Sequence, residues 1–226
     1  KKIMALGFEN IFEIAKVFRN KEQESSWHKP EFMMLEWYRK NVDYKKIMTD
    51  FEELFISLTV HETLMYQGDK YDLKRPWPRF SVSELFSHAC RQAGSRVPEV
   101  EDEFFYKFLN EIEPKLRDSG KPAIVYDWPA NMASLSRKKP EDPRFAERFE
   151  VYLAGVELCN AFSELTDPAE QRQRFEEEMA LRQAQGKLVY PIDEELLEAL
   201  GQVESMAGNA VGVDRLIMLL GDFEAV

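Results

Sequence analysis

The sequence has few residues that could serve covalent or redox chemistry. It contains two cysteines and three histidines among 226 residues, and Cys90 and Cys159 lack the spacing of a metal or thiol–disulfide motif. No Ser/His/Asp or Cys/His set can be assembled from histidines as scattered as His28, His61 and His88. The chain also has neither a GxxxxGK[ST] phosphate loop nor a GxGxxG segment after a strand. If the protein binds a nucleotide, a different scaffold must hold it.

Long apolar runs and an excess of basic residues are missing as well. No apolar segment is long enough to cross a bilayer, and the start of the chain has no signal-peptide pattern. The net charge of −11 argues against a protein whose whole surface binds nucleic acid, but a local basic patch is compatible with it. With free thiols as the simple interpretation, these features predict a cytoplasmic protein without membrane contact. The opening residues KKIMALGFEN contain no initiator or cap, so we expect a longer parent chain.

What the sequence does contain is a succession of strand-like and helix-like segments. Segments rich in β-branched and aromatic residues predict strands, and apolar residues at helical spacing predict helices. The predicted strands are 11–20, 31–40, 123–129 and the two arms of a hairpin over 148–167 that turns at Ala154-Gly155. The predicted helices are 43–58, 81–94, 100–120, a charged helix from Pro168 to Gly186, and a buried helix containing LIMLL.

Strand pairs that are adjacent in sequence favour an antiparallel sheet with helices packed on it, an α+β fold. We expect one domain over 1–226 with a helical insertion at about 61–120. The small residues of GNAVG, 208–212, are typical of a loop pressed against a phosphate or a base.

Three carboxylates are spaced seven residues apart, with an amide among them. Glu150, Glu157, Glu164 and Asn160 could share the solvated face of a helix, but Gly155 and its β-branched neighbours favour the hairpin. In that hairpin residue 150 faces 159, and Glu150 and Glu157 are diagonal neighbours on one face. Such a pair suits a hard divalent cation such as Mg²⁺, and an ordinary acidic strand remains the alternative.

Two arginines lie at the ends of predicted elements. Arg19 ends an otherwise apolar strand, and Arg215 follows the glycine-rich segment. A guanidinium is always charged and binds oxygens in a fork, which suits a phosphate clamp. Ordinary salt bridges are the alternative for either arginine. His28 and Phe32 are ambiguous in the same way, as an exposed loop histidine and a core aromatic.

Three separated stretches together resemble a known family. They are FRN…HKPEFMMLEWY, RFEVYLAGVELCNAFSELTD and GNAVGVDRL, in the order found in the catalytic core of class II aminoacyl-tRNA synthetases of the lysine branch. The resemblance implies an antiparallel sheet that binds ATP and activates an amino acid as its adenylate, with release of pyrophosphate. The family's first motif, which builds its dimer, would precede this chain, so a homodimer is expected of the full-length protein.

The resemblance also implies roles for individual residues. Arg19 resembles the arginine that bridges the α-phosphate and the amino-acid carboxylate, and Arg215 the one that stacks on adenine and reaches the γ-phosphate. The other ATP-binding positions are His28 near the terminal phosphates, Phe32 under adenine, and Gly212. Glu150 and Glu157 match a magnesium-binding pair. The lysine-binding positions are Glu36, Tyr38 and Glu164 around the ε-ammonium group and Asn160 at the carboxylate.

Three positions depart from the pattern of lysyl-tRNA synthetases. The usual Arg-x-Glu becomes Arg19-Asn20-Lys21-Glu22, so that Glu22 is the candidate for the ATP-binding glutamate, and Lys29 replaces an asparagine. Lysyl-tRNA synthetases resemble GxGxGxDR in this region, and Ala210 stands at the position of the middle glycine. With alanine at that position, the chain resembles the paralogues that ligate lysine, preferably β-lysine, to a lysine of elongation factor P.

The resemblance therefore implies an ATP-dependent lysine ligase that modifies elongation factor P and uses Mg²⁺, with Ala210 shaping the lysine pocket. Two alternatives stay open. One is the catalytic domain of a lysyl-tRNA synthetase, with tRNA as the acceptor. The other is a synthetase-like paralogue without catalytic activity.

Overall fold

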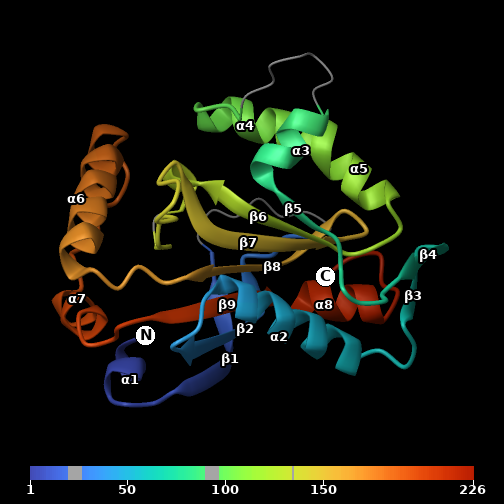
Figure 1. The fold of residues 1–226 in the computed structure, drawn as a ribbon, viewed down its shortest axis with the longest axis horizontal. Coiled ribbons are helices and arrows are strands. Elements are labelled where there is room, and N and C mark those ends of the chain that lie inside the picture. The colour runs from blue at the N-terminus through green and yellow to red at the C-terminus, as the bar shows by residue number, and fades with distance from the viewer. Residues whose placement is uncertain (20–26, 90–96, 134) are drawn as a thin grey trace.

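The computed structural model describes residues 1–19, 27–89, 97–133 and 135–226, and Figure 1 shows a curved sheet with helices on both faces. The seven strands follow the order β1-β2-β9-β8-β7-β6-β5, and all neighbours are antiparallel except β5 and β6. Their bounds are β1 Asn10–Phe18, β2 Glu31–Lys40, β5 Arg79–Ser81, β6 Ala123–Pro129, β7 Phe145–Leu153, β8 Val156–Ser163 and β9 Met206–Gly212. The predicted α+β class is confirmed.

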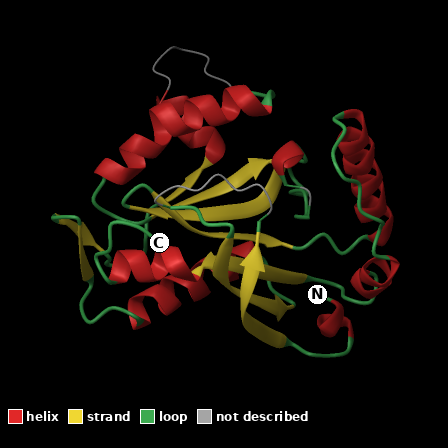
Figure 2. Cartoon of the chain, turned by 180° about the vertical axis from the view of Figure 1, so that it is seen from behind, coloured by secondary structure: helices red, strands yellow, loops and turns green. Residues whose placement is uncertain are grey.

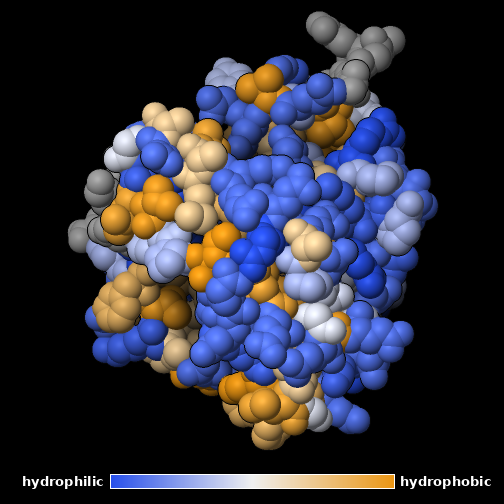
Figure 3. Space-filling model, turned by 90° about the vertical axis from the view of Figure 1, so that its left-hand side faces the viewer, coloured by the Kyte–Doolittle hydropathy of each residue, from blue (hydrophilic) through white to orange (hydrophobic). Residues whose placement is uncertain are grey.

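The helices flank this sheet. They are α1 Lys2–Ala5, α2 Tyr44–Ser57, α3 Val82–Ala89, α4 Glu101–Lys107, α5 Glu113–Asp118, α6 Pro168–Ala184, α7 Glu194–Leu200 and α8 Val213–Leu220, with a π turn at Phe108–Ile112 and a 3₁₀ turn at Ala130–Met132. Figure 2 shows from behind how α6 stands apart at one end of the molecule. Its outward surface faces the viewer in Figure 3, where hydrophilic side chains predominate. Among the described helices, none is both long and apolar enough to cross a bilayer.

The two faces of the sheet carry different helices because alternate residues of a strand point to opposite faces. Ile124 of β6 and Val151 of β7 pack in the core beneath α2 and α8, whereas Val125 and Tyr152 pack under α3 to α5. The second group of helices covers only the β6 and β7 end of its face. The same face of β2, β8 and β9 is left for the candidate site.

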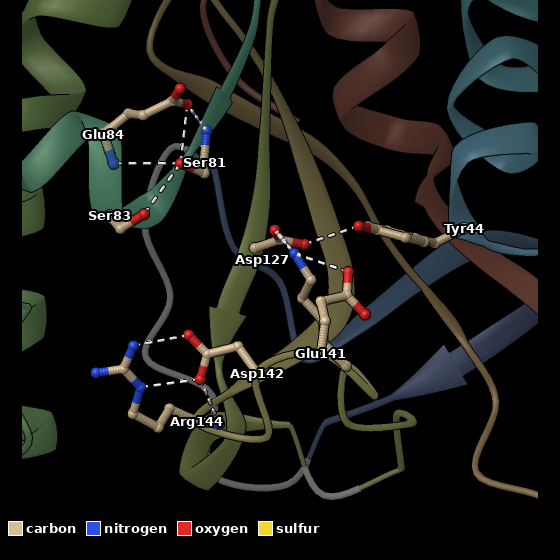
Figure 4. A network of polar contacts seen from close by, with 9 residues as sticks. Tyr44, Ser81, Ser83, Glu84, Asp127, Glu141, Asp142 and Arg144 are labelled. Atoms are coloured by element: carbon tan, nitrogen blue, oxygen red, sulfur yellow. Dashed lines mark hydrogen bonds and ion pairs between the residues drawn. The ribbon is translucent and has the colours of Figure 1, made fainter.

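Polar contacts fix how the helices begin. The Ser81 amide donates to Glu84 Oε2 at 2.8 Å and the Glu84 amide donates back to Ser81 Oγ at 3.2 Å, a capping box that confirms the serine cap of α3 (Figure 4). In the same view Tyr44 Oη donates to Asp127 Oδ1 at 2.7 Å. Lys139 forms an ion pair with the other Asp127 oxygen. Asp127 has φ of 59° where the register of β6 and β7 shifts. These contacts attach α2 to β6.

The segment predicted as a helical insertion, about 61–120, is more varied than the sequence suggested. It contains the hairpin of β3 Thr63–Tyr66 and β4 Asp69–Asp72, and also β5, before its helices begin. The helix predicted over 100–120 is divided into α4, the π turn and α5. Pro114 stands at the start of α5 and has no amide hydrogen to donate, which accounts for the interruption at this point.

Two predictions about the sheet are wrong: the pairing register of the hairpin, and the assignment of GNAVG to a loop. The hairpin turns at Ala154-Gly155 as predicted, but Glu150 pairs with Asn160 rather than with residue 159. A bulge inserts Leu158 between the pairs Val151–Cys159 and Tyr152–Glu157. The GNAVG segment is not a loop: it lies in β9, hydrogen-bonded between β2 and β8.

One buried amide in β9 predicts a stabilising substitution. Asn209 is 3% exposed, and among the described residues neither of its side-chain polar atoms has a nitrogen or oxygen partner; its polar neighbour is the Cys159 thiol, a weak partner. Such a group costs about 1–3 kcal/mol. Asn209→Val suits a strand and is expected to raise the free energy of unfolding by about 1 kcal/mol, measured as a higher urea midpoint. A lower midpoint would show that the amide is satisfied in solution.

Candidate active site

A cavity of about 480 Å³ lies on the open face of β2, β8 and β9. The start of α8 and residues 27–29 complete its walls. The sequence-predicted residues that line it are Arg19, His28, Phe32, Glu36, Tyr38, Glu157, Asn160, Ala210, Gly212 and Arg215. Glu150 and Glu164 are buried beside it, and Glu22 lies outside the described residues. The structure therefore brings nearly all of the predicted residues to one site.

One end of the cavity encloses a primary ammonium group. Lys1 Nζ forms an ion pair with Glu164 Oε2 at 2.6 Å. The same nitrogen lies 5.3 Å from the ring centre of Phe162 and 6.0 Å from that of Tyr38, within the range of cation–π attraction. Tyr38 Oη donates to Glu36 Oε1 at 3.4 Å. Carboxylates and aromatic rings here form an enclosure that suits an alkylammonium ion.

The enclosure requires glycine at position 208, because a side chain there would occupy the space of the Tyr38 ring. A Cβ at this position would come within 2.5 Å of the Tyr38 ring and 3.2 Å of Glu164 Oε1. Tyr38 pairs with Gly208 across β2 and β9, so the ring lies directly over the glycine. Neither Gly208 nor Phe162 was predicted as a site residue, although Phe162 follows Asn160 and precedes Glu164 on one face of the chain at period two.

Burial shifts the protonation of this end of the site. It raises the pKa of Glu164 to about 7, against the opposing effect of Lys1. Burial and the carboxylates of Glu164 and Glu36 also raise the pKa of Tyr38, which therefore keeps its proton and remains a donor. Because the folded pKa of Glu164 exceeds its unfolded value, the group stabilises the fold below about pH 4.5, and this contribution is lost as the pH rises to about 7.

The other end of the cavity is formed by cationic and aromatic groups. Arg215 Nη1 donates to the Glu157 carbonyl oxygen at 2.9 Å, and Nη2 lies 2.9 Å from His28 Nε2. The Arg19 guanidinium carbon lies 5.4 Å from the ring centre of Phe32. Both arginines thus face one space together with a histidine and a ring, an arrangement that suits phosphates and a flat base.

A side chain in the first turn of α8 attaches the start of this helix to β2. The Met33 amide donates to Asp214 Oδ2 at 2.7 Å, which joins α8 to β2. This contact sets the position of Arg215, the next residue. It explains why Asp and Arg are adjacent in GNAVGVDRL: the first anchors the helix and the second reaches the cavity.

The acidic pair lies between the two ends. Glu150 is 5% exposed, and it accepts from Arg148 Nη2 and from Tyr152 Oη, each at 2.5 Å. Burial and the charge of Glu157 raise the pKa of Glu150 to about 7. A divalent cation held by the two carboxylates would offset both the burial of the Glu150 charge and its repulsion by Glu157. Within the described part of the chain no cluster of three or more His, Cys, Asp or Glu side chains could hold a metal ion. Mg²⁺ is commonly bound by one or two carboxylates together with substrate phosphates.

The largely antiparallel sheet flanked by helices fits the catalytic domain of a class II synthetase. Residues 1–226, the whole chain, match the family model of tRNA synthetases class II (D, K and N), and the chain belongs to this family. The family expected from the sequence motifs is therefore confirmed.

Curated relatives include two kinds of ligase. The chain is 40% identical to the elongation factor P–(R)-β-lysine ligases of Vibrio vulnificus and Pectobacterium atrosepticum, over 97% of its own length and 70% of theirs. It is 36% identical to the lysine–tRNA ligase of Moorella thermoacetica, over 100% of its own length and 50% of that protein. The chain thus spans about half to 70% of the curated relatives that it matches.

Proposed function

We propose that the chain is the catalytic core of an ATP-dependent ligase that activates lysine, preferably β-lysine, and transfers it to a lysine side chain of elongation factor P. The observation that carries the proposal is the enclosure of Glu36, Tyr38, Phe162 and Glu164, where Lys1 places a primary ammonium group in the cavity that also holds Arg19 and Arg215. The names of the β-lysine ligase relatives and Ala210 support elongation factor P as the acceptor.

The residues would divide the work of adenylate formation by position. Glu36, Tyr38 and Glu164 bind the side-chain ammonium group of lysine, and Asn160 binds its carboxylate. A carboxylate oxygen attacks the α-phosphorus of ATP and pyrophosphate leaves. Arg19 neutralises the negative charge that shifts during this displacement, while Phe32 and Arg215 hold the base and His28 lies near the terminal phosphates.

The second step needs no covalent enzyme intermediate. The acceptor amine attacks the carbonyl carbon of the adenylate, AMP leaves, and the amine loses a proton as the amide forms. Catalysis rests on positioning and on charge neutralisation, consistent with the absence of a nucleophilic triad in the sequence. Glu150 and Glu157 would hold Mg²⁺, which neutralises phosphate charge when bound.

The exposed face of β1 supports a homodimer of the full-length protein. Phe12, Ile14 and Phe18 alternate along this edge strand and are 76%, 55% and 72% exposed. An apolar row of this kind on a sheet edge is typically covered by a partner. A second copy of the chain fits the dimer that the resemblance implies.

The activity is tested by amino-acid-dependent exchange of pyrophosphate into ATP. With full-length protein, ATP and Mg²⁺, both lysine isomers should support exchange, and β-lysine should give the higher kcat/KM. Leucine and glutamate serve as controls, because neither places an ammonium group in the enclosure. Exchange with none of the lysine isomers would favour a paralogue without catalytic activity.

The protonation of Glu164 predicts how the lysine KM depends on pH. Only the carboxylate form attracts an ammonium group, and burial raises its pKa to about 7. The KM for lysine should therefore fall by about tenfold between pH 6 and pH 8 and then level off, measured by exchange at saturating ATP. In the Glu164→Gln variant the KM for lysine should not fall in this way between pH 6 and pH 8. A lysine KM independent of pH in the unaltered protein would contradict the assignment of Glu164 to the ammonium group.

Ala210 predicts the preference between isomers. It lies directly between Glu36 and Asn160 in the sheet register, at the midpoint between the groups proposed for the two ends of lysine. Ala210→Gly removes one methyl group and is expected to move the ratio of kcat/KM toward α-lysine by about tenfold. The measurement is exchange with each isomer. An unchanged ratio would mean that the methyl group does not contact the substrate.

A further inference from the structure

Arg148 joins the two halves of the candidate site, although the resemblance implied no role for this first residue of RFEVYLAGVELCNAFSELTD. Its side chain is 14% exposed and lies on β7 beside Glu150. Nη2 donates to Glu150 Oε1 at 2.5 Å, and Nε donates to Asn160 Oδ1 at 3.1 Å. Nη1 donates to the Met132 carbonyl oxygen at 2.5 Å, and the guanidinium carbon lies 4.7 Å from the ring centre of Trp128. Every nitrogen of the guanidinium group is engaged.

These contacts determine the orientation of the Asn160 amide. An arginine has only N–H donors, so the carboxamide must turn its oxygen toward Arg148. Its NH₂ group is then directed away from Arg148, and Asn160 lines the cavity. A substrate carboxylate has only acceptor atoms and needs the NH₂ group. Without Arg148, the amide could rotate by half a turn and present its oxygen to the carboxylate.

We propose that Arg148 is a positioning residue that fixes Asn160 for recognition of the lysine carboxylate and at the same time holds Glu150 in place. The proposal rests on the proposed function, because it assigns the carboxylate of lysine to Asn160. Met132 and Trp128 in turn hold Arg148 itself. The planar guanidinium group holds its donors on three separate nitrogens in fixed directions, whereas the three donors of a lysine ammonium group rotate about one nitrogen.

The test compares two ligands that differ only in the carboxylate. Lysine is compared with 1,5-diaminopentane, which has the same chain and a terminal ammonium group but no carboxylate. In full-length Arg148→Lys the positive charge beside Glu150 is kept, while the fixed donor to Asn160 is lost. The KM for lysine should rise by about tenfold, and the inhibition constant of 1,5-diaminopentane should stay within about twofold.

Arg137→Lys is the matched control. Arg137 Nη2 lies 2.6 Å from Glu147 Oε2, so it forms a comparable arginine–glutamate pair with the residue next to Arg148. It lies outside the cavity lining, and its replacement should change neither constant. If both constants rise together in Arg148→Lys, or if neither changes, the proposed role of Arg148 is wrong.

Asn160→Asp makes the same comparison if Arg148→Lys fails to fold. It keeps an acceptor for Arg148 but removes the NH₂ group, so lysine should bind about tenfold more weakly or worse. The dication 1,5-diaminopentane should bind at least as tightly as before, because the new carboxylate attracts it. Unchanged lysine binding would overturn the proposal. Failure of the proposed function has a different signature, because the unaltered protein would then neither use lysine nor be inhibited by the diamine.

Discussion

Arg19→Ala is expected to lower the rate of lysine-dependent pyrophosphate exchange by about 1,000-fold, while the far-ultraviolet circular dichroism spectrum and the urea midpoint stay unchanged. Arg19 directly follows β1 at the cavity, and its guanidinium lies over Phe32. A preorganised donor aimed at the charge that develops in the transition state contributes about 100- to 1,000-fold on its own, and a charged donor lies at the upper end. Because the side chain is exposed, its loss leaves the core intact.

Arg144→Ala is the control for Arg19→Ala. The Arg144 side chain is 74% exposed and forms an ion pair with Asp142, two residues away. It lies outside the cavity lining, so exchange should be unaffected. Normal exchange in Arg19→Ala would refute the placement of the α-phosphate beside this residue.

Glu164→Gln is expected to raise the KM for lysine by about 100-fold and to leave the KM for ATP within about twofold. Glutamine keeps the shape of the side chain and removes its charge. Loss of one partner of a buried ion pair costs about 3 kcal/mol or more, and 1.4 kcal/mol corresponds to a factor of ten. Glu164 is 2% exposed and is the residue that holds the Lys1 ammonium group, so its charge should dominate this end of the cavity.

Glu147→Gln is the matched control for Glu164→Gln. Glu147 is also largely buried, at 8% exposure, and is paired with Arg137 instead of facing the cavity. Its replacement should affect stability but not the KM for lysine. Equal effects on the lysine KM from the two variants would mean that Glu164 acts through the fold and not through the ammonium group.

Periodicity was enough to predict the elements that pack strongly. Ile47, Phe51 and Phe55 share the buried face of α2, and the observed helix begins and ends within a residue of the predicted 43–58. The turn at Ala154-Gly155 was predictable from its glycine: both residues have positive φ, 56° and 78°, and glycine adopts such angles readily. Such features depend on neighbours that are close in sequence.

Features that depend on distant neighbours could not be predicted. β9 consists mainly of small residues with low strand propensity, and it forms a strand because β2 and β8 pair with it on either side. The bulge at Leu158 follows from the fit of β7 to β8 and leaves no mark in the local sequence. The parallel pairing of β5 with β6 is likewise a matter of tertiary packing.

The same distinction applies to the site. The family motifs pointed to side chains that line the cavity, such as Glu36 and Arg215, and the structure places them there. The motifs contain residues that act through others, but implied no role for them. Gly208 provides space for Tyr38, and Arg148 orients Asn160. Both relations cross strands, so only the register reveals them.

The measurement that tests the central claim most directly is the identity of the acceptor. The full-length protein is incubated with ATP, Mg²⁺ and each lysine isomer, with elongation factor P and lysine tRNA offered in parallel, and the mass of each acceptor is followed. The account predicts that elongation factor P gains the mass of one lysine residue, faster with β-lysine, and that the tRNA gains none. Transfer to the tRNA alone would contradict it and would identify the chain as the core of a lysyl-tRNA synthetase.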